Sequence, residues 1–328
     1  MEIPYHPAWE KRDSSKLDDY ITCPRKFFFS HILGWQTETH RHDLFFGECW
    51  HIAREHMLIN GYEDVMGAYK AFLQRYREVL EPETDEIYRP KCPDAVLMAL
   101  AEFSGNPTRC YDLQNNEVLY TEISGSVPID EKRVLYFRMD SVIRNKEDGS
   151  IFSWDHKSKG GDFNRQWEDK FFLSLQNGTY THCLYCMYPD EMKAKKIKGV
   201  EFCGTAFKYL KRGGKVNPQG YNIDLLRVPA WKSSEQMNIW LWNTIDILDN
   251  LDRDMDRLHS CKESDPVMMC FQQNPTSCTD YFGCLYHDYC MSWSNPLRHS
   301  FEPPLGFIES HWDPTKMETT NKMDLEWR

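Results

Sequence analysis

Two short apolar runs that each end in an acidic residue most constrain how this chain can fold. They are "LYFRMD" and "IFSWD", and they flank "RNKEDG", a turn signal typical of a β-hairpin. A hairpin centred near Glu147–Asp148 sets Asp140 roughly opposite Asp155. Opposed residues on one face of an antiparallel pair have Cβ atoms about 5 Å apart. The pattern therefore predicts two carboxylates close together where core strands end.

Lys157 follows Asp155 by two residues, so both side chains point to the same face of the strand. Two neighbouring carboxylates can hold a hard divalent cation, with oxygen ligands about 2.1 Å from Mg²⁺. A lysine beside them can orient a water or stabilise charge on a phosphate. The same spacing is also common at solvated strand ends. The apolar runs favour the functional interpretation, because burying an unpaired acid costs several kcal/mol.

The order of the sequence patterns predicts a mixed α/β fold with a central sheet flanked by helices. Helical patterns come first, then short β-branched and aromatic runs, then a helix, two strands and a long helix. The expected helices are 16–35 (broken near Pro24), 44–60, 62–80, 90–105, 165–188 and 233–258, and the expected strands are 117–129, 133–143, 150–158, 199–210 and 220–228.

We expect one domain over residues 1–296, followed by a partly irregular tail at 297–328. Its parts are a helical segment at 1–115, a sheet core at 116–230, and a final helix with a cysteine cluster at 231–296.

Composition and charge narrow the classes of function. The net charge of −11 disfavours a broad nucleic-acid-coating surface, although a local groove stays open. No apolar run approaches the length of a membrane span, so no membrane partner is expected. The N-terminus has no apolar core segment of the secretory kind, which indicates a cytoplasmic location. Twelve cysteines in that compartment favour metal ligands and buried thiols over disulfides.

Three of the cysteines stand near the end of the chain with five residues between successive members: Cys278, Cys284 and Cys290. A closed tetrahedral metal site needs four ligands. Cys270 and His287 are competing candidates nearby. A separate Cys-x-x-Cys pair at 183 and 186 lies inside an expected helix, where buried core is favoured over a redox motif.

Taken together, the acidic residues and Lys157 resemble the PD-(D/E)xK nuclease superfamily, in its RecB-like exonuclease branch. That branch has an Asp before a hairpin and Asp/Glu-x-Lys after it, which Asp140, Asp155 and Lys157 match. It also has a Gly-x-x-x-His helix upstream, matched by "GECWH", and a Gln-x-x-x-Tyr helix downstream, matched by "QNGTY". The resemblance implies a restriction-endonuclease-like core with a central mixed β-sheet.

The resemblance also implies roles for these residues. His51, Asp140 and Asp155 would bind Mg²⁺ or Mn²⁺, together with the backbone carbonyl of His156. Lys157 would be catalytic alongside the two acids. In the downstream motif, Gln176 and Tyr180 are i and i+4 on one helix face, and would lie near the scissile phosphate. Glu122 precedes the hairpin in a strand and has only a weak claim to the site.

Some members of this branch, including CRISPR-associated RecB-like exonucleases and the AddB nuclease domain, hold a 4Fe–4S cluster with one early and three late cysteines. The stretch "TCPRKFFF" supplies Cys23 as the early ligand, and Cys278, Cys284 and Cys290 complete the set. The late segment looks especially like viral and phage members, whose location would be the host cytoplasm. Better-known members separate the first two late cysteines by two residues, and five stand here. Four thiolates also suit Zn²⁺, so both metals stay open.

The resemblance implies a metal-dependent DNA exonuclease in recombination, repair or processing. Its partner would be DNA, as ends or single strands, with further proteins of a DNA-processing complex. The alternative is a non-catalytic subunit that binds nucleic acid through the same fold. The presence of every expected active-site residue type favours the enzyme.

Overall fold

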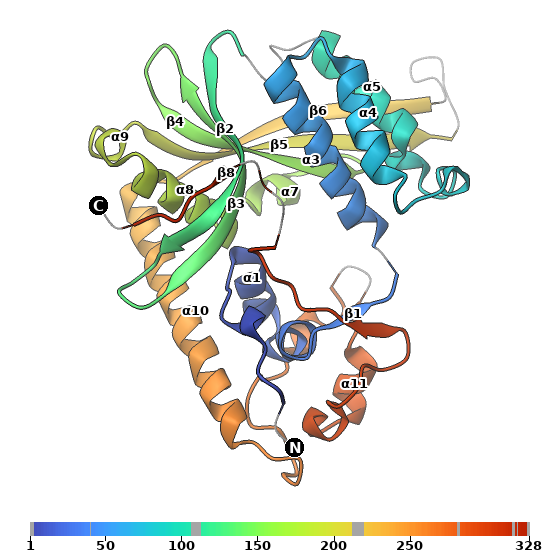
Figure 1. Ribbon diagram of the computed structural model, residues 1–328, viewed down its shortest axis with the longest axis vertical. Helices are drawn as coiled ribbons and strands as arrows, with labels where there is room; N and C mark the ends of the chain where they lie inside the picture. The colour runs from blue at the N-terminus through green and yellow to red at the C-terminus, as the bar shows by residue number, and fades with distance from the viewer. Residues whose placement is uncertain are drawn as a thin grey trace. The chain divides into compact units, whose positions relative to one another are not determined.

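A computed structural model describes residues 3–39, 41–105, 113–211, 220–280, 283–316, 319 and 321–326. Over these residues the protein is a mixed α/β protein with a central six-stranded mixed sheet and ten α-helices (Figure 1). The α-helices are α1 (Ser14–Thr22), α2 (Pro24–Phe27), α3 (His42–Asn60), α4 (Val65–Tyr76), α5 (Pro93–Gly105), α7 (Arg165–Asp169), α8 (Leu175–Met187), α9 (Pro189–Lys193), α10 (Ser234–Ser260) and α11 (His287–Ser292).

The strands and the shorter helical turns complete the inventory. The strands are β1 (Trp35–Thr37), β2 (Asn116–Pro128), β3 (Val134–Asn145), β4 (Ile151–Gly160), β5 (Ile197–Leu210), β6 (Gly220–Trp231), β7 (Phe307–Glu309) and β8 (Asn321–Lys322). The turns are η1 (Pro7–Trp9), the π-helical η2 (Phe28–Ile32), η3 (Pro82–Thr84), η4 (Arg89–Lys91), η5 (Pro275–Ser277) and η6 (Pro296–His299).

The central sheet has the strand order β6-β5-β4-β3-β2-β8. The pairs β3–β4 and β5–β6 are antiparallel, whereas β4–β5 and β2–β8 are parallel. A parallel pair needs a long crossover connection, and the segment that carries α7, α8 and α9 supplies it between β4 and β5. The five strands expected from the sequence are β2 to β6, so that part of the prediction is confirmed.

The chain divides into two compact units that are interleaved in sequence. Unit 1 consists of Met1–Thr39, Gly125–Phe137 and Ser234–Glu318, and unit 2 of His40–Ser124, Arg138–Ser233 and Thr319–Arg328. The expected single domain over residues 1–296, and its expected division at 115 and 230, stay predictions.

In unit 2, helices α3, α4 and α5 lie side by side against one face of the sheet (Figure 1). Their apolar residues form one core with alternate residues of the strands, including Trp154 of β4 and Phe207 of β5. The ring of Phe207 meets Trp50 of α3 edge-on at a centroid distance of 5.3 Å. The two-residue period of the strands selects this face, because residues i and i+2 point the same way.

The opposite face of the sheet is covered by α7 and α8. Phe171, just after α7, stacks on Phe202 of β5 with centroids 4.1 Å apart. The sequence predicted one continuous helix over 165–188, and that prediction is wrong because the chain turns between α7 and α8. Ser174 caps α8 by accepting a hydrogen bond from the N–H of Asn177 at 3.2 Å. Serine at an N-cap starts a new helix and so ends the preceding run.

Gly204 of β5 allows α7 to approach the sheet closely. A Cβ atom at this position would lie 2.5 Å from Cη2 of Trp167 and 2.8 Å from Cε1 of Phe163. We expect Gly204→Ala to lower the free energy of unfolding by about 1–3 kcal/mol through overpacking. Gly105→Ala is the control, because nothing lies within 4 Å of its added Cβ. Urea denaturation of both variants tests this, and equal stabilities would contradict the packing argument.

Unit 1 is held together by aromatic rings and by the two-stranded pair β1–β7. Trp35 of β1 pairs with Glu309 of β7, and its ring stacks on Phe29 at 5.4 Å. The hydroxyl of Tyr286 donates to the backbone carbonyl of Trp35 at 2.5 Å. These contacts bring the segment that precedes residue 40 beside the one that follows residue 283. Over its described residues, the expected tail at 297–328 is irregular apart from β7, β8 and the remainder of η6 after Pro296.

Asp18 of α1 is a half-buried acid whose charge opposes folding. Burial, followed by the charges of Asp19 and Asp13, raises the pKa of Asp18 to about 6. An acid with a raised pKa stabilises the fold at low pH, and that contribution is lost as pH rises from 3.8 to about 6.

We therefore expect Asp18→Asn to increase the free energy of unfolding at pH 7 by about 1 kcal/mol, after allowance for its partial exposure. The gain should shrink as pH falls toward about 4. Asp256→Asn, on an exposed position of α10, is the control. Urea denaturation between these pH values is the measurement, and a gain that is independent of pH would contradict the assignment.

Within the described ranges, no helix has both the length and the hydropathy needed to cross a membrane.

Candidate functional site

The β3–β4 hairpin sets the two predicted acids at one point of the sheet. Ser141 pairs with Trp154, so the same register continued by one residue sets Asp140 opposite Asp155. The centre of this register lies between Glu147 and Asp148, as the turn sequence predicts. The backbone N–H of His156 donates to Oδ2 of Asp140 at 2.7 Å, which ties the two strands together beside the acids. Asp140 and Asp155 are both buried.

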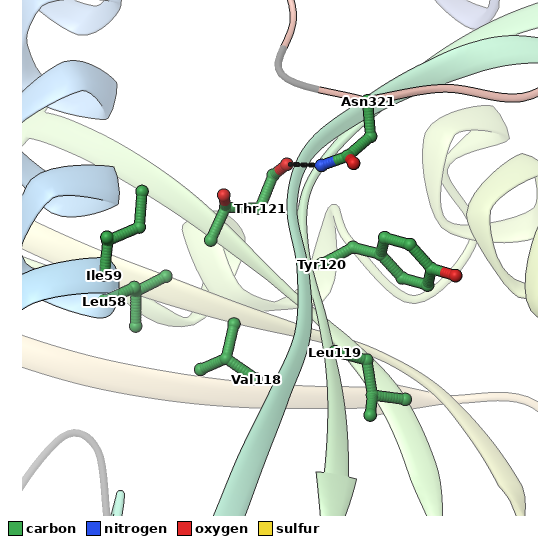
Figure 2. A pocket seen from close by; sticks show the side chains of 7 residues that line it. All are labelled: Leu58, Ile59, Val118, Leu119, Tyr120, Thr121 and Asn321. Atoms are coloured by element: carbon green, nitrogen blue, oxygen red, sulfur yellow. Dashed lines mark hydrogen bonds between the residues drawn. The ribbon is translucent and has the colours of Figure 1, made fainter.

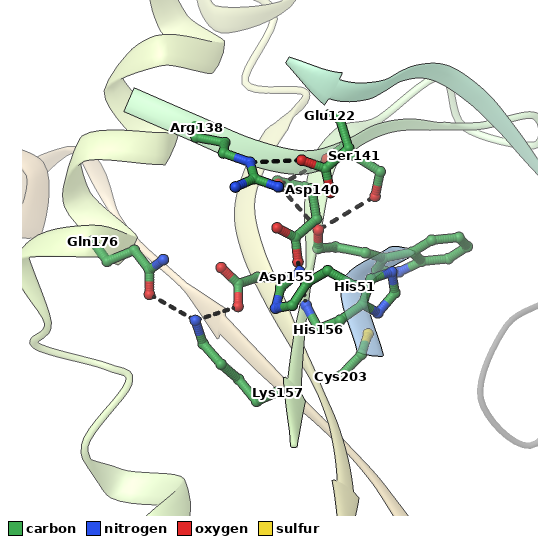
Figure 3. Close-up of polar contacts among 12 residues, drawn as sticks. His51, Glu122, Arg138, Asp140, Ser141, Asp155, His156, Lys157, Gln176 and Cys203 are labelled. Atoms are coloured by element: carbon green, nitrogen blue, oxygen red, sulfur yellow. Dashed lines mark hydrogen bonds and ion pairs between the residues drawn. The ribbon is translucent and has the colours of Figure 1, made fainter. Parts of the chain in front are cut away.

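His51 reaches the acids from α3. Its Nδ1 lies 3.0 Å from Oδ2 of Asp140, and one donor atom each of His51, Glu122 and Asp140 all lie within 4.8 Å of one another (Figure 3). In an octahedral site with bonds of about 2.1 Å, adjacent donors are about 3.0 Å apart and opposite donors about 4.2 Å. The 3.0 Å separation of His51 and Asp140 matches adjacent donors, and with Glu122 within 4.8 Å the three form a group that could hold a hard divalent cation.

Glu122, whose claim to the site is weak from the sequence, is one of the three donors that lie nearest one another. It lies in β2 with a φ of 43°, a left-handed conformation that is uncommon for a residue other than glycine. Its Oε2 accepts a hydrogen bond from Nε of Arg138 at 2.7 Å. Strained backbone of this kind persists only where the surroundings hold it, and it is frequent at functional sites. The conformation has no signature in the sequence, so only the structure reveals it.

Lys157 lies at the centre of a chain of hydrogen bonds between β4, α8 and β3 (Figure 3). Its Nζ is 2.7 Å from Oδ1 of Asp155 and donates to Oε1 of Gln176 at 3.1 Å. Nε2 of Gln176 donates to the hydroxyl of Tyr180 at 2.9 Å, and that hydroxyl donates to the backbone carbonyl of Arg138. Gln176 and Tyr180 therefore hold Lys157 in position relative to the strand that carries Asp140.

The structure thus brings together every site residue that the sequence predicted around the acids. The grouping differs in one respect: the three donors nearest one another include Glu122, while Asp155 pairs with Lys157. Whether Asp155 binds metal stays a prediction. The backbone carbonyl of His156 stays a predicted ligand as well. The His156 imidazole is buried, and burial together with the charge of Arg54 holds its pKa well below the usual value.

The acids cannot all be ionised together without cost. Burial and the charge of Asp140 raise the pKa of Glu122 to about 7. Burial, with a further contribution from Asp140, raises the pKa of Asp155 to about 6 against the opposing charge of Lys157. Burial alone would raise the pKa of Asp140 and lower that of His51. Their mutual charge and hydrogen bond outweigh burial, so the pKa of Asp140 falls and that of His51 rises.

Protons should therefore compete with metal at this site. We expect the affinity for Mn²⁺ to rise between about pH 6 and pH 8, because Glu122 and Asp155 lose their protons over that range. Glu122→Gln should weaken binding and flatten the pH dependence. Isothermal titration calorimetry with Mn²⁺ is the measurement, and an affinity that is independent of pH would contradict these protonation states.

The predicted cysteine site lies in unit 1. The N–H of Asn274 donates to Sγ of Cys23 at 3.4 Å, and Sγ of Cys278 lies 3.8 Å from the carbonyl oxygen of the same asparagine. The N–H of Cys284 donates to the carbonyl of Cys278 at 2.9 Å, and Cys290 follows in α11. Asn274 therefore links the early cysteine to the first of the late ones.

The thiols also influence one another electrostatically. Burial raises the pKa of Cys290 to about 11, and the charges of Cys23, Cys284 and Cys278 contribute in the same direction. Burial, then the charges of Cys284 and Cys23, also raises the pKa of Cys278. Thiolates that repel one another in this way are stabilised by a cation, so the set fits a thiolate-bound metal.

The competing ligand candidates and the Cys-x-x-Cys pair have different surroundings. Cys270 is fully buried, and its sulfur is 3.8 Å from that of Cys261. Nδ1 of His287 lies 3.5 Å from Oδ1 of Asp288. The Cys183 and Cys186 thiols are buried in α8, and burial raises the pKa of both, which agrees with the buried-core interpretation.

A separate open pocket of about 390 Å³ lies between the end of α3 and β2 (Figure 2). Its lining includes Leu58, Val118 and Asn321, whose Nδ2 donates to the carbonyl of Thr121 at 3.0 Å. The lining residues include no carboxylate, imidazole or thiol, so the chemistry of the acidic site is not repeated there.

Comparisons with known proteins give little. No protein-family model matches the chain, and no curated protein matches it. One solved structure to which it is similar is described as "Crystal structure of SSO0001", at 11% identity with a TM-score of 0.25. That comparison covers 71% of this chain and 82% of the other. A likeness of this size carries no argument about fold or function.

Proposed function

We propose that this protein is a metal-dependent deoxyribonuclease with a restriction-endonuclease-like core, acting as an exonuclease in DNA recombination, repair or processing. The observation that carries the proposal is the group of half-buried His51 with buried Glu122 and Asp140, with Lys157 ion-paired to Asp155 beside it. A binding protein has no need to bury three carboxylates at such electrostatic cost, whereas a site for metal-assisted hydrolysis does.

The residues of the chain divide the chemistry between them. His51, Glu122 and Asp140 would hold a Mg²⁺ or Mn²⁺ ion, with Asp155 as a further acidic ligand. When bound, the ion would lower the pKa of a water and neutralise charge on the phosphate. Lys157 orients the attacking water and stabilises the negative charge that develops on the phosphate oxygens. Gln176 and Tyr180 keep the Lys157 ammonium at a fixed position while Asp155 balances its charge.

The four cysteines support a proposed 4Fe–4S cluster with a structural role. Bonds of about 2.3 Å to a tetrahedral zinc ion would set the four sulfurs about 3.8 Å apart. All four cysteines belong to the described residues, and no three of their sulfurs lie within 4.8 Å of one another. This wider spacing favours a cluster, which is larger than a single ion. Cys23, Cys278, Cys284 and Cys290 would supply one thiolate to each iron.

Cleavage of end-labelled DNA tests the proposed function. Purified full-length protein is incubated with single-stranded and duplex DNA, labelled at either end, in Mg²⁺, Mn²⁺ or EDTA. We expect loss of the label or shortening of the strand in the divalent cations only. Circular substrates distinguish exonuclease from endonuclease action. Intact substrates in both cations, or equal cleavage in EDTA, would contradict the proposal.

A further inference from the structure

A positively charged surface lies around the turn that joins α7 to α8. It comprises Lys159 at the end of β4, Lys170 just after α7, and the exposed apolar side chains of Phe172 and Leu173. Phe172 is 40% exposed and Leu173 is 83% exposed. We call these four residues the lysine–phenylalanine surface. It is an exception in a chain whose net charge is −11.

Two of the acids near this surface in sequence are paired with other bases, whereas Glu168 lies farther than 4.0 Å from both ammonium groups. Asp162 lies 2.5 Å from Nζ of Lys208, and Asp169 lies 3.3 Å from Nε of Arg165. Over the ranges that the structure describes, no carboxylate lies within 4.0 Å of either ammonium group of the lysine–phenylalanine surface. Their charges are available to an anion from solution.

Ring contacts connect this surface to the catalytic lysine. The Lys170 ammonium lies 4.8 Å from the ring centroid of Phe171, which stacks on Phe202 at 4.1 Å. The Lys157 ammonium lies 5.8 Å from the centroid of that same Phe202 ring. Lys157 and Lys159 are two residues apart on β4 and so point to one face. Partial burial and the charges of Lys157 and Lys159 lower the pKa of Lys170. The three ammonium groups are therefore close enough to repel one another electrostatically.

The backbone of the turn is anchored. Nζ of Lys232, a buried lysine just after β6, donates to the carbonyl of Phe172 at 2.6 Å. Nδ2 of Asn177 donates to the carbonyls of Phe171 and Ala230 at 3.2 and 2.7 Å. A ring presented from a fixed backbone loses little conformational entropy when it binds a flat partner.

We infer that the lysine–phenylalanine surface binds single-stranded DNA beside the catalytic site, with Lys159 and Lys170 on successive phosphates and Phe172 stacked on a base. This inference rests on the proposed function and names the form of its substrate. Charge complementarity selects a polyanion, and the combination of a half-buried and an exposed lysine with an exposed ring favours a strand whose bases are unpaired. A duplex presents phosphates but hides the faces of its bases.

The phosphate contacts are tested by equilibrium binding. Fluorescence anisotropy of a labelled oligothymidine of about 16 nucleotides is followed in EDTA, where no divalent-dependent cleavage occurs, over a range of KCl. The variant with both Lys159→Ala and Lys170→Ala should bind about tenfold more weakly. Its plot of log affinity against log salt should be shallower by about 1.4 for two lost phosphate contacts. The control combines Lys70→Ala with Lys193→Ala, which removes two exposed lysines from the same unit.

The stacking contact has a different signature. Phe172→Ala should weaken binding at least about fivefold and leave the salt dependence unchanged, because a ring releases no counterions. Phe301→Ala, which removes a ring that is 65% exposed, is the control. Under turnover in Mn²⁺, the lysine and phenylalanine variants should raise KM and leave kcat near the wild-type value.

The possible outcomes distinguish failure of this inference from failure of the proposed function. Unchanged affinity in the lysine variant, or a loss no larger than that of its control, overturns the inference. Equal affinity of the wild-type protein for duplex and single strand overturns its choice of single-stranded DNA. A protein that binds the strand through these residues but cleaves nothing in Mn²⁺ contradicts the proposed function alone. If the wild-type protein cleaves DNA and the lysine variant has the same DNA affinity and KM, the inference alone is contradicted.

Discussion

Asp140→Asn should abolish divalent-cation-dependent DNA cleavage, lowering the single-turnover rate by at least about a thousandfold. Asn keeps the size of the side chain and can still accept the hydrogen bond from the N–H of His156, so the hairpin should stay intact. It removes the charge that raises the pKa of His51 and that faces Glu122 across the proposed metal site. Loss of Mn²⁺ binding by calorimetry should accompany the loss of cleavage.

Lys157→Ala should cause a loss of cleavage of about a hundredfold to a thousandfold while Mn²⁺ binding is retained. The two variants therefore separate metal binding from charge stabilisation. Asp190→Asn, at a position 93% exposed on α9, is the control for purification and folding. If both site variants cleave as the wild type does, the activity belongs to another site or to a contaminant.

Cys23→Ser should release the bound metal and unfold unit 1. A structural thiolate–metal site contributes on the order of 10 kcal/mol of folding free energy, which is comparable to the whole stability of an ordinary domain. We expect the variant to be purified without the broad visible absorbance of the wild-type protein, and to lose about four irons per chain. Protease digestion should then cut within the segments of unit 1 first.

Cys186→Ser is the matched control, because it removes a buried thiol of α8 that belongs to unit 2. It should keep the metal and the protease pattern of the wild type. Zinc at one equivalent in anaerobically purified protein would overturn the choice of iron and sulfur but keep the site. A protein without metal, as stable as its Cys23→Ser variant, would overturn the site itself.

The part of the fold that could be predicted from sequence depends on local periodicity. The apolar alternation before Asp140 and Asp155, with the turn between them, fixes the register of β3 and β4 to the residue. The match of "GECWH" to a Gly-x-x-x-His helix predicts His51 near the acids, and its Nδ1 lies 3.0 Å from Oδ2 of Asp140. These signals are encoded within a few residues of each side chain, so the sequence contains them directly.

Other features depend on contacts between distant segments. The turn between α7 and α8 is held by a hydrogen bond from Lys232, which lies 60 residues beyond Phe172 in the chain. The strand β8 joins the edge of β2 through only two paired positions, too few for any periodic signal. Glu122 enters the acidic group because its backbone takes a left-handed conformation, and propensity does not predict such a conformation for glutamate.

The interleaving of the two units sets an order for biosynthesis. Cys23 leaves the ribosome early, and its proposed partner thiols follow only at Cys278 and beyond. At about 5–20 residues per second, the first thiol waits on the order of ten to fifty seconds for the others. Unit 2 has all its strands except β8 by residue 231, so most of its sheet can form during that interval. Insertion of the proposed cluster would therefore come last, and a cell short of iron would then accumulate chains with a folded sheet and unattached ends.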